Sequence, residues 1–458
     1  MSKQTLGRAL TFSIVASFFW GAGYDFFSSQ GMSYPGYVAL GILTAAAILW
    51  ITEAVPLFVT SLIVLFLSIT WLLPCMKEAG IESQRSDFLS PFFSDVIVLF
   101  LGGFAISSAM HKRQLDEALA AMIISKTGST FPRLLLGVMA VTAVLSMWLS
   151  NTATAAMMLA LVLPIAGRME SDDLRAKSIL LSVPFAANIG GLGTPIGSPP
   201  NAIAMQYMTA ADIAPSFAQW MLIGVPGVIG MLAIAWGLLL VLFPSDHEDV
   251  PSSESTIRIQ FDLPFWIIVV TVAITVLGWM TTSFHGQSSG TVALIPVIVF
   301  FASSVLETRD LRHMSWEVLI MMGGGLCLGT AISSSGLASW LVDLLPVDGL
   351  GSFWLTILFG GVACFMSSLM SNTATANLIL PIIIGLSVDT VSPMMIGTAF
   401  GCSLAMPLPV STPPNAMAFS SGQINVADMV RPGLILTVTG ILLAFTTGYW
   451  WWDLMGIW

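Results

Sequence analysis

Long apolar stretches without charge constrain this chain of 458 residues more than any other feature. Several of them run for about 20 residues, the length that a helix needs to cross roughly 30 Å of hydrocarbon. Hydrophobic residues make up 56% of the chain and charged residues only 9%, and the mean hydropathy is +0.89. The short alternating segments that are typical of a membrane β-barrel are absent from the sequence. The sequence therefore predicts an all-α polytopic membrane protein.

We expect about 11 transmembrane helices, two of them interrupted, and two hairpins whose apolar arms of about fifteen residues are too short to cross. The hairpins are therefore predicted to be re-entrant. A polar amphipathic stretch at 112–127 is predicted to lie along the membrane interface. The spans run at about 9–28, 36–53, 55–74, 91–110, 177–208, 217–243, 263–281, 291–306, from 317, 393–420 and 432–452, and the hairpins at 131–166 and 352–384.

The distribution of lysine and arginine supports this count. With the N-terminus in the cytoplasm, only Lys77 and Arg85 of the 15 basic side chains fall on the external side. Such an excess follows the positive-inside rule. We therefore expect an integral membrane protein with a cytoplasmic N-terminus and an external C-terminus. The same count makes the two halves of the chain run in opposite directions, as an inverted repeat.

One polar phrase occurs twice in this apolar sequence. Ser-Asn-Thr-Ala-Thr-Ala stands at 150–155 and again at 371–376, 221 positions later, and each copy lies at the tip of a predicted hairpin. In lipid, such an interruption persists only where it is buried or lines a cavity. One copy alone is equally consistent with a surface loop or with an N-cap that starts a helix. Two copies in matching contexts favour a functional site.

A second pair of motifs interrupts two of the spans. Residues 190–201 read Gly-Gly-Leu-Gly-Thr-Pro-Ile-Gly-Ser-Pro-Pro-Asn, and residues 410–416 read Val-Ser-Thr-Pro-Pro-Asn-Ala. Glycine and proline at this density break a helix. Paired broken helices in an inverted repeat indicate a substrate site near the midplane of the membrane.

The predicted centre is almost free of ionisable side chains, because Asp389, in a loop, is the only one in the stretches that form it. A proton-driven carrier is expected to keep an Asp, Glu or His relay inside the membrane, so coupling to a proton through a buried side chain is disfavoured. Side-chain oxygens of Ser, Thr and Asn, and carbonyls freed by the helix breaks, suit Na⁺ instead.

The same centre is suited to an anion without any basic residue. Pro199 and Pro413 stand where a helix start tolerates proline, and each helix N-terminus carries roughly half a positive charge and free N–H groups. Asn151 and Asn372 are able to offer an oxygen to a cation and an N–H to an anion at once. We therefore expect an anion held by helix ends, with bound cations offsetting its charge.

Other classes of protein fit less well. A net charge of −10 argues against nucleic acid as a partner. An intramembrane enzyme would need a buried Asp pair, a Ser with a base or a His-rich metal site, and none lies in the predicted core. A channel would need a continuous pore, which hairpins that end at the midplane do not provide. The four cysteines are expected to be small apolar fillers, and no organic cofactor is expected.

The two Ser-Asn-Thr phrases, the two Pro-Pro-Asn breaks and the stretch Trp-Ile-Thr-Glu-Ala-Val-Pro at 50–56 carry a resemblance to a known family. Over nearly its whole length the chain resembles the divalent anion/sodium symporters, in particular the bacterial INDY-type dicarboxylate transporters. The resemblance implies a homodimer in a prokaryotic cytoplasmic (inner) membrane, whose subunits each have a fixed scaffold domain and an elevator-type transport domain. We expect the scaffold at 1–130 and 263–351, the transport part at 131–243 and 352–458, and a cytoplasmic linker at 244–262.

The resemblance also implies the ligand sets, position by position. Each sodium site would draw on one hairpin tip and one broken helix; Ser146 and Ser367, like the phrases themselves, are 221 positions apart. The second set departs from the first in using a methionine carbonyl and in having Ser411 opposite Gly197. The first sodium site would use Ser146, Ser150, Asn151 and the Gly197 carbonyl, the second Ser367, the Met370 carbonyl, Asn372 and Ser411, and the substrate carboxylates would contact Asn151, Thr152, Ser198, Asn372, Thr373, Thr412 and Pro413.

The expected activity is secondary-active, Na⁺-coupled symport of C4 dicarboxylates such as succinate by an elevator-type mechanism, with Na⁺ binding first. A dicarboxylate exchanger of the same fold, or a symporter for citrate or sulfate, remains an alternative at this point.

Overall fold

The computed structural model describes residues 23–126, 130–169, 173–244, 260–344, 351–384 and 391–456. Every regular element in these ranges is a helix. Most of the first predicted span (9–28) and most of the predicted linker (244–262) lie outside the described residues, and so does Asp389.

The first half of the described chain runs through α2 (Tyr24–Ser28), α3 (Tyr34–Thr52), α4 (Leu57–Leu67), the π-helix η1 (Ser68–Leu72), α5 (Leu73–Glu78), α6 (Arg85–Leu89), the 3-10 helix η2 (Ser90–Phe93), α7 (Asp95–Lys112), α8 (Leu115–Lys126), α9 (Phe131–Ser146), α10 (Asn151–Ala166), α11 (Leu174–Gly190), α12 (Pro199–Ala210) and α13 (Phe217–Leu242). The second half runs through α14 (Leu263–Met280), α15 (Thr282–His285), α16 (Ser289–Ala302), α17 (Thr308–Arg312), α18 (Trp316–Ser334), α19 (Leu337–Leu344), α20 (Ser352–Leu369), α21 (Asn372–Ile384), α22 (Val391–Ser403), α23 (Pro413–Ser420), α24 (Val426–Leu443), the π-helix η3 (Ala444–Gly448) and α25 (Tyr449–Leu454).

Eight of the described helical segments are long and apolar enough to cross a membrane. Seven of them coincide with predicted spans: Tyr34–Thr52, Leu57–Glu78, Arg85–Lys112, Phe217–Leu242, Leu263–Met280, Trp316–Ser334 and Val426–Leu454. The eighth is α20, the first arm of the second hairpin, whose 18 residues exceed the arm length that we expected. The remaining described spans are outside this set because α16 has only 14 residues and because the two broken spans are each divided into two shorter helices.

The stretch 50–56 forms the corner between α3 and α4. Glu53 ends α3 in the left-handed region, with φ 47°, and Pro56 is the N-cap of α4. The indole N–H of the buried Trp50 donates to the carbonyl of Leu57 across the corner, at 3.2 Å. This contact fixes the angle at which the two helices meet.

The two halves of the chain are joined by pairs of helices in close contact. α7 packs on α16, and α18 packs on α4. A Cβ on Gly102 of α7 would collide with the backbone of Ala293, and a Cβ on Gly324 of α18 would collide with Ser61. Glycine at these two positions therefore permits the backbones to approach, as small residues do between membrane helices.

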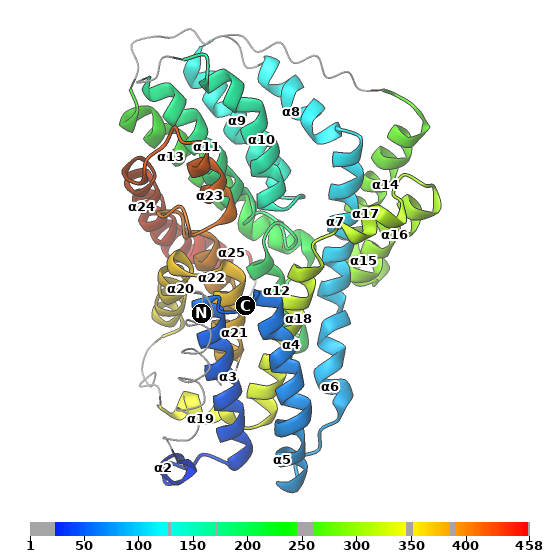
Figure 1. The fold of residues 1–458 in the computed structure, drawn as a ribbon, viewed down its shortest axis with the longest axis vertical. Coiled ribbons are helices and arrows are strands. Elements are labelled where there is room, and N and C mark those ends of the chain that lie inside the picture. Colours follow the sequence, from blue (N-terminus) through cyan, green and yellow to red (C-terminus); the bar gives the residue numbers. More distant parts are fainter. Residues whose placement is uncertain are drawn as a thin grey trace, which may run out of the picture.

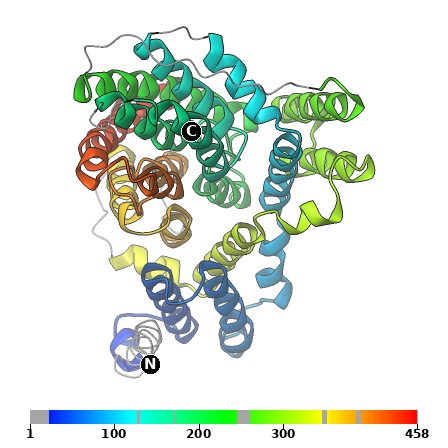
Figure 2. The same ribbon diagram turned by 45° about the horizontal axis from the view of Figure 1, so that its top comes forward.

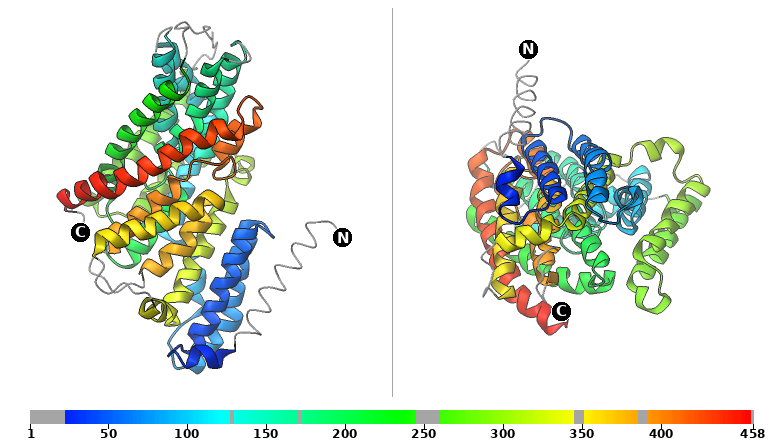
Figure 3. Two further views of the ribbon diagram at one scale, coloured as in Figure 1. Left: turned by 90° about the vertical axis from the view of Figure 1, so that its left-hand side faces the viewer. Right: turned by 90° about the horizontal axis from the view of Figure 1, so that it is seen from below.

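Figure 1 shows α9, α10, α11 and α13 gathered at one end of the molecule, and α3, α4 and α18 toward the other. In Figure 2, α14, α15 and α16 form a separate group on the far side of α7. The left view of Figure 3 shows α24, in red, lying between the green helices and α20, in yellow, and α24 contacts both α13 and α20. Segments from both halves of the chain are thus interleaved around the centre.

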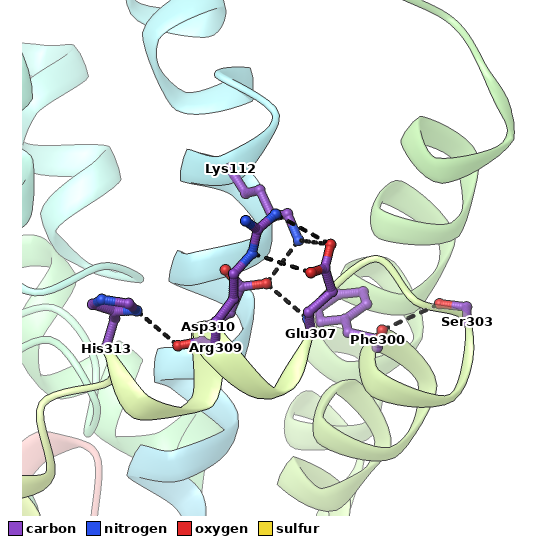
Figure 4. A network of polar contacts seen from close by, with 7 residues as sticks. All are labelled: Lys112, Phe300, Ser303, Glu307, Arg309, Asp310 and His313. Carbon is purple, nitrogen blue, oxygen red and sulfur yellow. Dashed lines mark hydrogen bonds and ion pairs between the residues drawn. The ribbon is translucent and has the colours of Figure 1, made fainter.

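A polar cluster at the end of α7 adds a second connection between the halves (Figure 4). The ammonium group of Lys112 lies 2.7 Å from a carboxylate oxygen of Asp310 and 3.4 Å from one of Glu307, in and just before the short helix α17. The next residue, Arg113, pairs with Asp262 at the start of α14. Such partly exposed pairs contribute little stability; the pairs of Lys112 connect α7 to the turn between α16 and α18, and the pair of Arg113 connects α7 to the start of α14.

Candidate functional site

Each predicted hairpin tip lies where one helix ends and the next begins. The first tip lies between α9 and α10, and the second lies between α20 and α21. Ser150 is the N-cap of α10, and its hydroxyl oxygen accepts the N–H of Ala153 at 3.1 Å. The N-cap interpretation thus holds for Ser150 in the first copy of the phrase, while Asn151 and Asn372 are the first residues of α10 and α21.

In the first tip, one hydroxyl lies between two acceptor oxygens. The Ser146 Oγ is 2.6 Å from Asn151 Oδ1 and 2.8 Å from the carbonyl oxygen of Ala187 in α11. A serine hydroxyl has one hydrogen, and the other two oxygens have none to give. Three oxygens therefore converge with a single hydrogen among them, at a residue that is fully buried. Such an electron-rich cluster suits a cation.

The second tip repeats this cluster. The Ser367 Oγ is 2.6 Å from Asn372 Oδ1 and 2.8 Å from the carbonyl oxygen of Cys402 in α22, and Ser367 is also fully buried. The same three oxygens, with the same distances, thus occur in both halves of the chain.

The Gly197 carbonyl lies close to the first cluster. A Cβ on Gly191 would stand 2.8 Å from Asn151 Oδ1 and 3.0 Å from the oxygen of Gly197. Both predicted ligand oxygens are therefore grouped around one point in the break between α11 and α12. Among the predicted members of the first sodium site, the structure brings Ser146, Asn151 and Gly197 together.

The predicted members of the second sodium site lie on the corresponding segments of the second half. Ser411 donates from its Oγ to the carbonyl of Ser368 at 3.0 Å, next to Ser367. Met370 leaves α20 in an extended conformation, with φ −140° and ψ 177°, so its carbonyl points out of the helical pattern.

An asparagine closes each helix break. Asn201 donates from Nδ2 to the carbonyls of Gly191 (2.8 Å) and Thr194 (2.9 Å). Asn415 donates in the same way to the carbonyls of Met406 (2.9 Å) and Leu408 (3.0 Å). These asparagines belong to the Pro-Pro-Asn motifs, although the sequence alone indicated no separate role for them. Their position could have indicated this role, because each is a polar residue that directly follows a pair of prolines.

The predicted contacts to the substrate all lie at helix starts. Ser198 and Thr412 are the N-caps of α12 and α23, which begin at Pro199 and Pro413 as we expected. Thr152 and Thr373 are the second residues of α10 and α21. Four helices therefore direct N-terminal N–H groups and partial positive charge from these positions.

Three hydrogen bonds among the described residues connect the broken helices of the two halves, and one of them runs from Asn188 Nδ2 to Asn415 Oδ1 at 3.3 Å. Asn188 Nδ2, near the end of α11, donates to Thr412 Oγ1 at 3.1 Å, and the hydroxyls of Ser403, at the end of α22, and Ser198 lie 3.0 Å apart. α10 also packs on α23, and α21 on α12. Sequence reasoning missed Asn188 and Ser403, because neither stands in a repeated motif.

An aromatic stack holds the first tip from outside. The ring of Trp148 stacks on Phe217 of α13 and on Trp279 of α14, with centroids 6.1 and 6.4 Å apart, and Phe217 and Trp279 are 5.0 Å apart. Leu369, at the position of Trp148 in the second tip, is 61% exposed. The two tips are thus alike in their hydrogen bonds and different in their surroundings.

The chemistry of the site is neutral on the protein side. Among the residues that the structure describes, no group of three or more His, Cys, Asp or Glu side chains could hold a metal ion. The donor set at the tips is made of hydroxyl, amide and carbonyl oxygens, which fits a hard monovalent cation as the transported ion.

Comparisons with known proteins agree with this architecture. A family model described as "Citrate transporter" (CitMHS) matches residues 47–392. The sodium-dependent dicarboxylate transporter SdcS of Staphylococcus saprophyticus is 34% identical over 464 residues, covering 92% of this chain and 87% of its own length. SdcS of Staphylococcus aureus (strain USA300) is 33% identical over 465 residues, covering 93% and 87%.

Two solved structures share the fold. The YdaH transporter of Alcanivorax borkumensis gives a TM-score of 0.53 at 14% identity, covering 80% of this chain and 86% of that one. MtrF of Neisseria gonorrhoeae gives 0.53 at 13% identity, covering 80% and 82%. The matches of sequence and fold together lead to one conclusion: the chain belongs to the divalent anion/sodium symporter family, within the group that the citrate transporter model describes, and it is an integral membrane transporter and not an enzyme.

Proposed function

We propose that this transporter is a secondary-active symporter that couples Na⁺ to the movement of a C4 dicarboxylate. The observation that carries the proposal is the pair of oxygen clusters, Ser146–Asn151–Ala187 and Ser367–Asn372–Cys402, each with one hydrogen among three oxygens. The names of the relatives, which are sodium-dependent dicarboxylate transporters, support the same ion and substrate.

In this mechanism Na⁺ binds first, at the residues that the family resemblance implies. The cation binds to the oxygens of each cluster. This binding holds the side-chain amide of Asn151 or Asn372 in one orientation. The substrate then faces a set of hydrogen-bond donors. These are the amide N–H groups of the two asparagines, the hydroxyls of Ser198 and Thr412, and the N-terminal N–H groups of α10, α12, α21 and α23. Two such sets, one from each half, suit a substrate with two carboxylates.

Uptake of radiolabelled succinate into proteoliposomes tests this function. A symporter takes up succinate when Na⁺ is higher outside and does so without substrate in the lumen. Uptake that is indifferent to Na⁺ would contradict coupling, and uptake that requires a lumen loaded with dicarboxylate would identify an exchanger. Competition by malate, fumarate, citrate and sulfate then defines the anion.

The elevator mechanism is part of the proposal, with residues 131–243 and 352–458 moving against 1–130 and 263–351. The contact between α18 and the helices α12 and α21 supports it. α18 presents Gly325 to the side chain of Asn377 and Gly329 to the ring of Tyr207, and a glycine face has no side chains that would obstruct sliding. Only two hydrogen bonds cross there, from Tyr207 to the Gly325 carbonyl (3.0 Å) and from Asn377 to the Met321 carbonyl (3.2 Å), among the described residues.

A cross-link across this contact tests the motion. The double variant Gly325→Cys/Asn377→Cys, made in a background without the native cysteines, introduces one thiol on α18 and one on α21. The two positions face each other across the contact, as a disulfide requires. Oxidation should stop uptake and reduction should restore it. Full uptake by the cross-linked protein would contradict movement at this surface, and each single variant serves as the control for oxidation.

A homodimer in the inner membrane, with the N-terminus cytoplasmic, completes the proposal. It follows from the family resemblance and from the distribution of basic residues. Light scattering of the detergent-solubilised protein tests the dimer, and labelling of single cysteines from either side of the membrane tests the orientation.

A further inference from the structure

Thr412 and Ser198 occupy equivalent places, at the N-caps of α23 and α12, but their hydroxyls are held differently. Thr412 Oγ1 accepts two N–H groups, from Asn188 Nδ2 at 3.1 Å and from the backbone of Asn415 at 3.3 Å. Ser198 Oγ contacts only another hydroxyl, that of Ser403 at 3.0 Å, and caps no N–H of its own helix.

The direction of the bonds at Thr412 is fixed by a chain of three steps. The carbonyls of Met406 and Leu408 are acceptors only, so Asn415 must turn its NH₂ group toward them. Its Oδ1 is then an acceptor, and Asn188 must present its own NH₂ group to it, at 3.3 Å. The second hydrogen of that NH₂ group points to Thr412 Oγ1.

The consequence concerns the hydrogen of the Thr412 hydroxyl. Both lone pairs of the oxygen are occupied by N–H groups, so the hydroxyl is able to act only as a donor. Among the residues that the structure describes, no acceptor takes this hydrogen. The residue is 3% exposed, at a helix start where N–H groups and partial positive charge already favour an anion.

The corresponding chain is absent in the first half. Asn201 is turned in the same way by the carbonyls of Gly191 and Thr194, but its Oδ1 has no partner among the described residues. Ser403 stands where Asn188 would be expected and bonds to Ser198 instead. Either hydroxyl of that pair is able to donate, so the direction of the Ser198 hydrogen is open.

We propose that Asn188 is a positioning residue that makes Thr412 an obligatory hydroxyl donor to one carboxylate of the substrate, whereas Ser403 leaves Ser198 free to donate or accept. The inference rests on the proposed function. It assigns the two ends of the bound dicarboxylate unequal partners: a fixed donor at Thr412 and an adaptable hydroxyl pair at Ser198.

The test measures thermal stabilisation of the purified protein by succinate at constant Na⁺, and by Na⁺ without succinate. Asn188→Ala should weaken succinate binding about tenfold, which corresponds to about 1.4 kcal/mol, and should leave stabilisation by Na⁺ alone unchanged. Asn188→Ser, whose hydroxyl is still able to donate, should lose less. A role that is merely structural would reduce both responses.

A double-mutant cycle with Thr412→Val separates positioning from a general loss of packing. If Asn188 acts through Thr412, the double variant should bind succinate no more weakly than Thr412→Val alone. Ser182→Ala on the same helix is the matched control, because its buried hydroxyl bonds only to the carbonyl of Ile179. It should bind succinate as the wild type does.

Each outcome decides a different claim. Equal succinate binding in the wild type and Asn188→Ala, or fully additive losses in the double variant, would overturn the positioning role and leave the proposed function intact. A wild type that succinate does not stabilise at any Na⁺ concentration would instead overturn the proposed function. If Asn188→Ala does not fold, Asn188→Ser decides between these results.

Discussion

Replacing Gly191 with alanine tests the geometry of the first cation cluster. Gly191 follows α11 in an ordinary right-handed conformation, with φ −55° and ψ −19°, so alanine meets no backbone strain there. Its Cβ would stand 2.8 Å from Asn151 Oδ1, 2.9 Å from Asn151 Nδ2 and 3.0 Å from the Gly197 oxygen. The methyl group would therefore occupy space needed by two of the predicted sodium ligands.

The size of the effect follows from overpacking. A single extra methyl group in a closely packed site costs about 1–3 kcal/mol, and each 1.4 kcal/mol is a factor of about ten in binding. Because the collision involves Asn151 and Gly197 directly, we expect most of this energy to be lost from Na⁺ binding. The half-saturating Na⁺ concentration for succinate uptake should rise about 5- to 100-fold.

The assay is initial uptake into proteoliposomes over a Na⁺ series at saturating succinate. Gly227→Ala in α13 is the matched control, because a Cβ there meets no atom within 4 Å, and it should keep the Na⁺ dependence of the wild type. Wild-type Na⁺ dependence in Gly191→Ala would refute the claim that Asn151 and Gly197 hold the cation.

Two further predictions concern the packing around the site. Trp279→Ala should destabilise the protein by about 3–5 kcal/mol, as large aromatic truncations do, and Trp279→Phe by much less, because a ring still stacks on Trp148 and Phe217; equal losses in thermal unfolding would contradict a role for the stack. Gly324→Ala should lower the free energy of unfolding by about 1–3 kcal/mol, because its methyl group collides with Ser61 between α18 and α4. Gly361→Ala is the control: a Cβ there meets no atom within 4 Å, so this variant should not lower the melting temperature.

The sequence was sufficient to predict the two hairpins and the two broken helices. Their signals are local, because glycine, proline and clusters of Ser, Asn and Thr end helices wherever they occur. α10 and α21 begin at the asparagines of the repeated phrase, and α12 and α23 begin at the prolines that we expected to start them. The sequence led us to expect a shorter α20. Its first turns are as apolar as those of a full span, and the helix therefore reaches the length of one.

The hydrogen bonds that connect the two halves could not be predicted. Asn188 meets Thr412 across 224 positions, and Ser198 meets Ser403 across 205. Neither pair is marked by spacing or by a motif, and only the packing of α11 on α23 brings Asn188 into reach. The stack of Trp148, Phe217 and Trp279 is equally hidden, because tryptophan is common in this chain and its position alone indicates no partner.

The central claim is that Na⁺ at the two oxygen clusters creates the site for the dicarboxylate. The most direct measurement is equilibrium binding of succinate to the purified protein, with Na⁺ replaced stepwise by K⁺ at constant ionic strength. We predict that succinate affinity falls at least about tenfold as Na⁺ is removed, and that succinate tightens Na⁺ binding by the same factor, as linkage requires. An equal affinity for succinate in Na⁺ and in K⁺ would contradict the account.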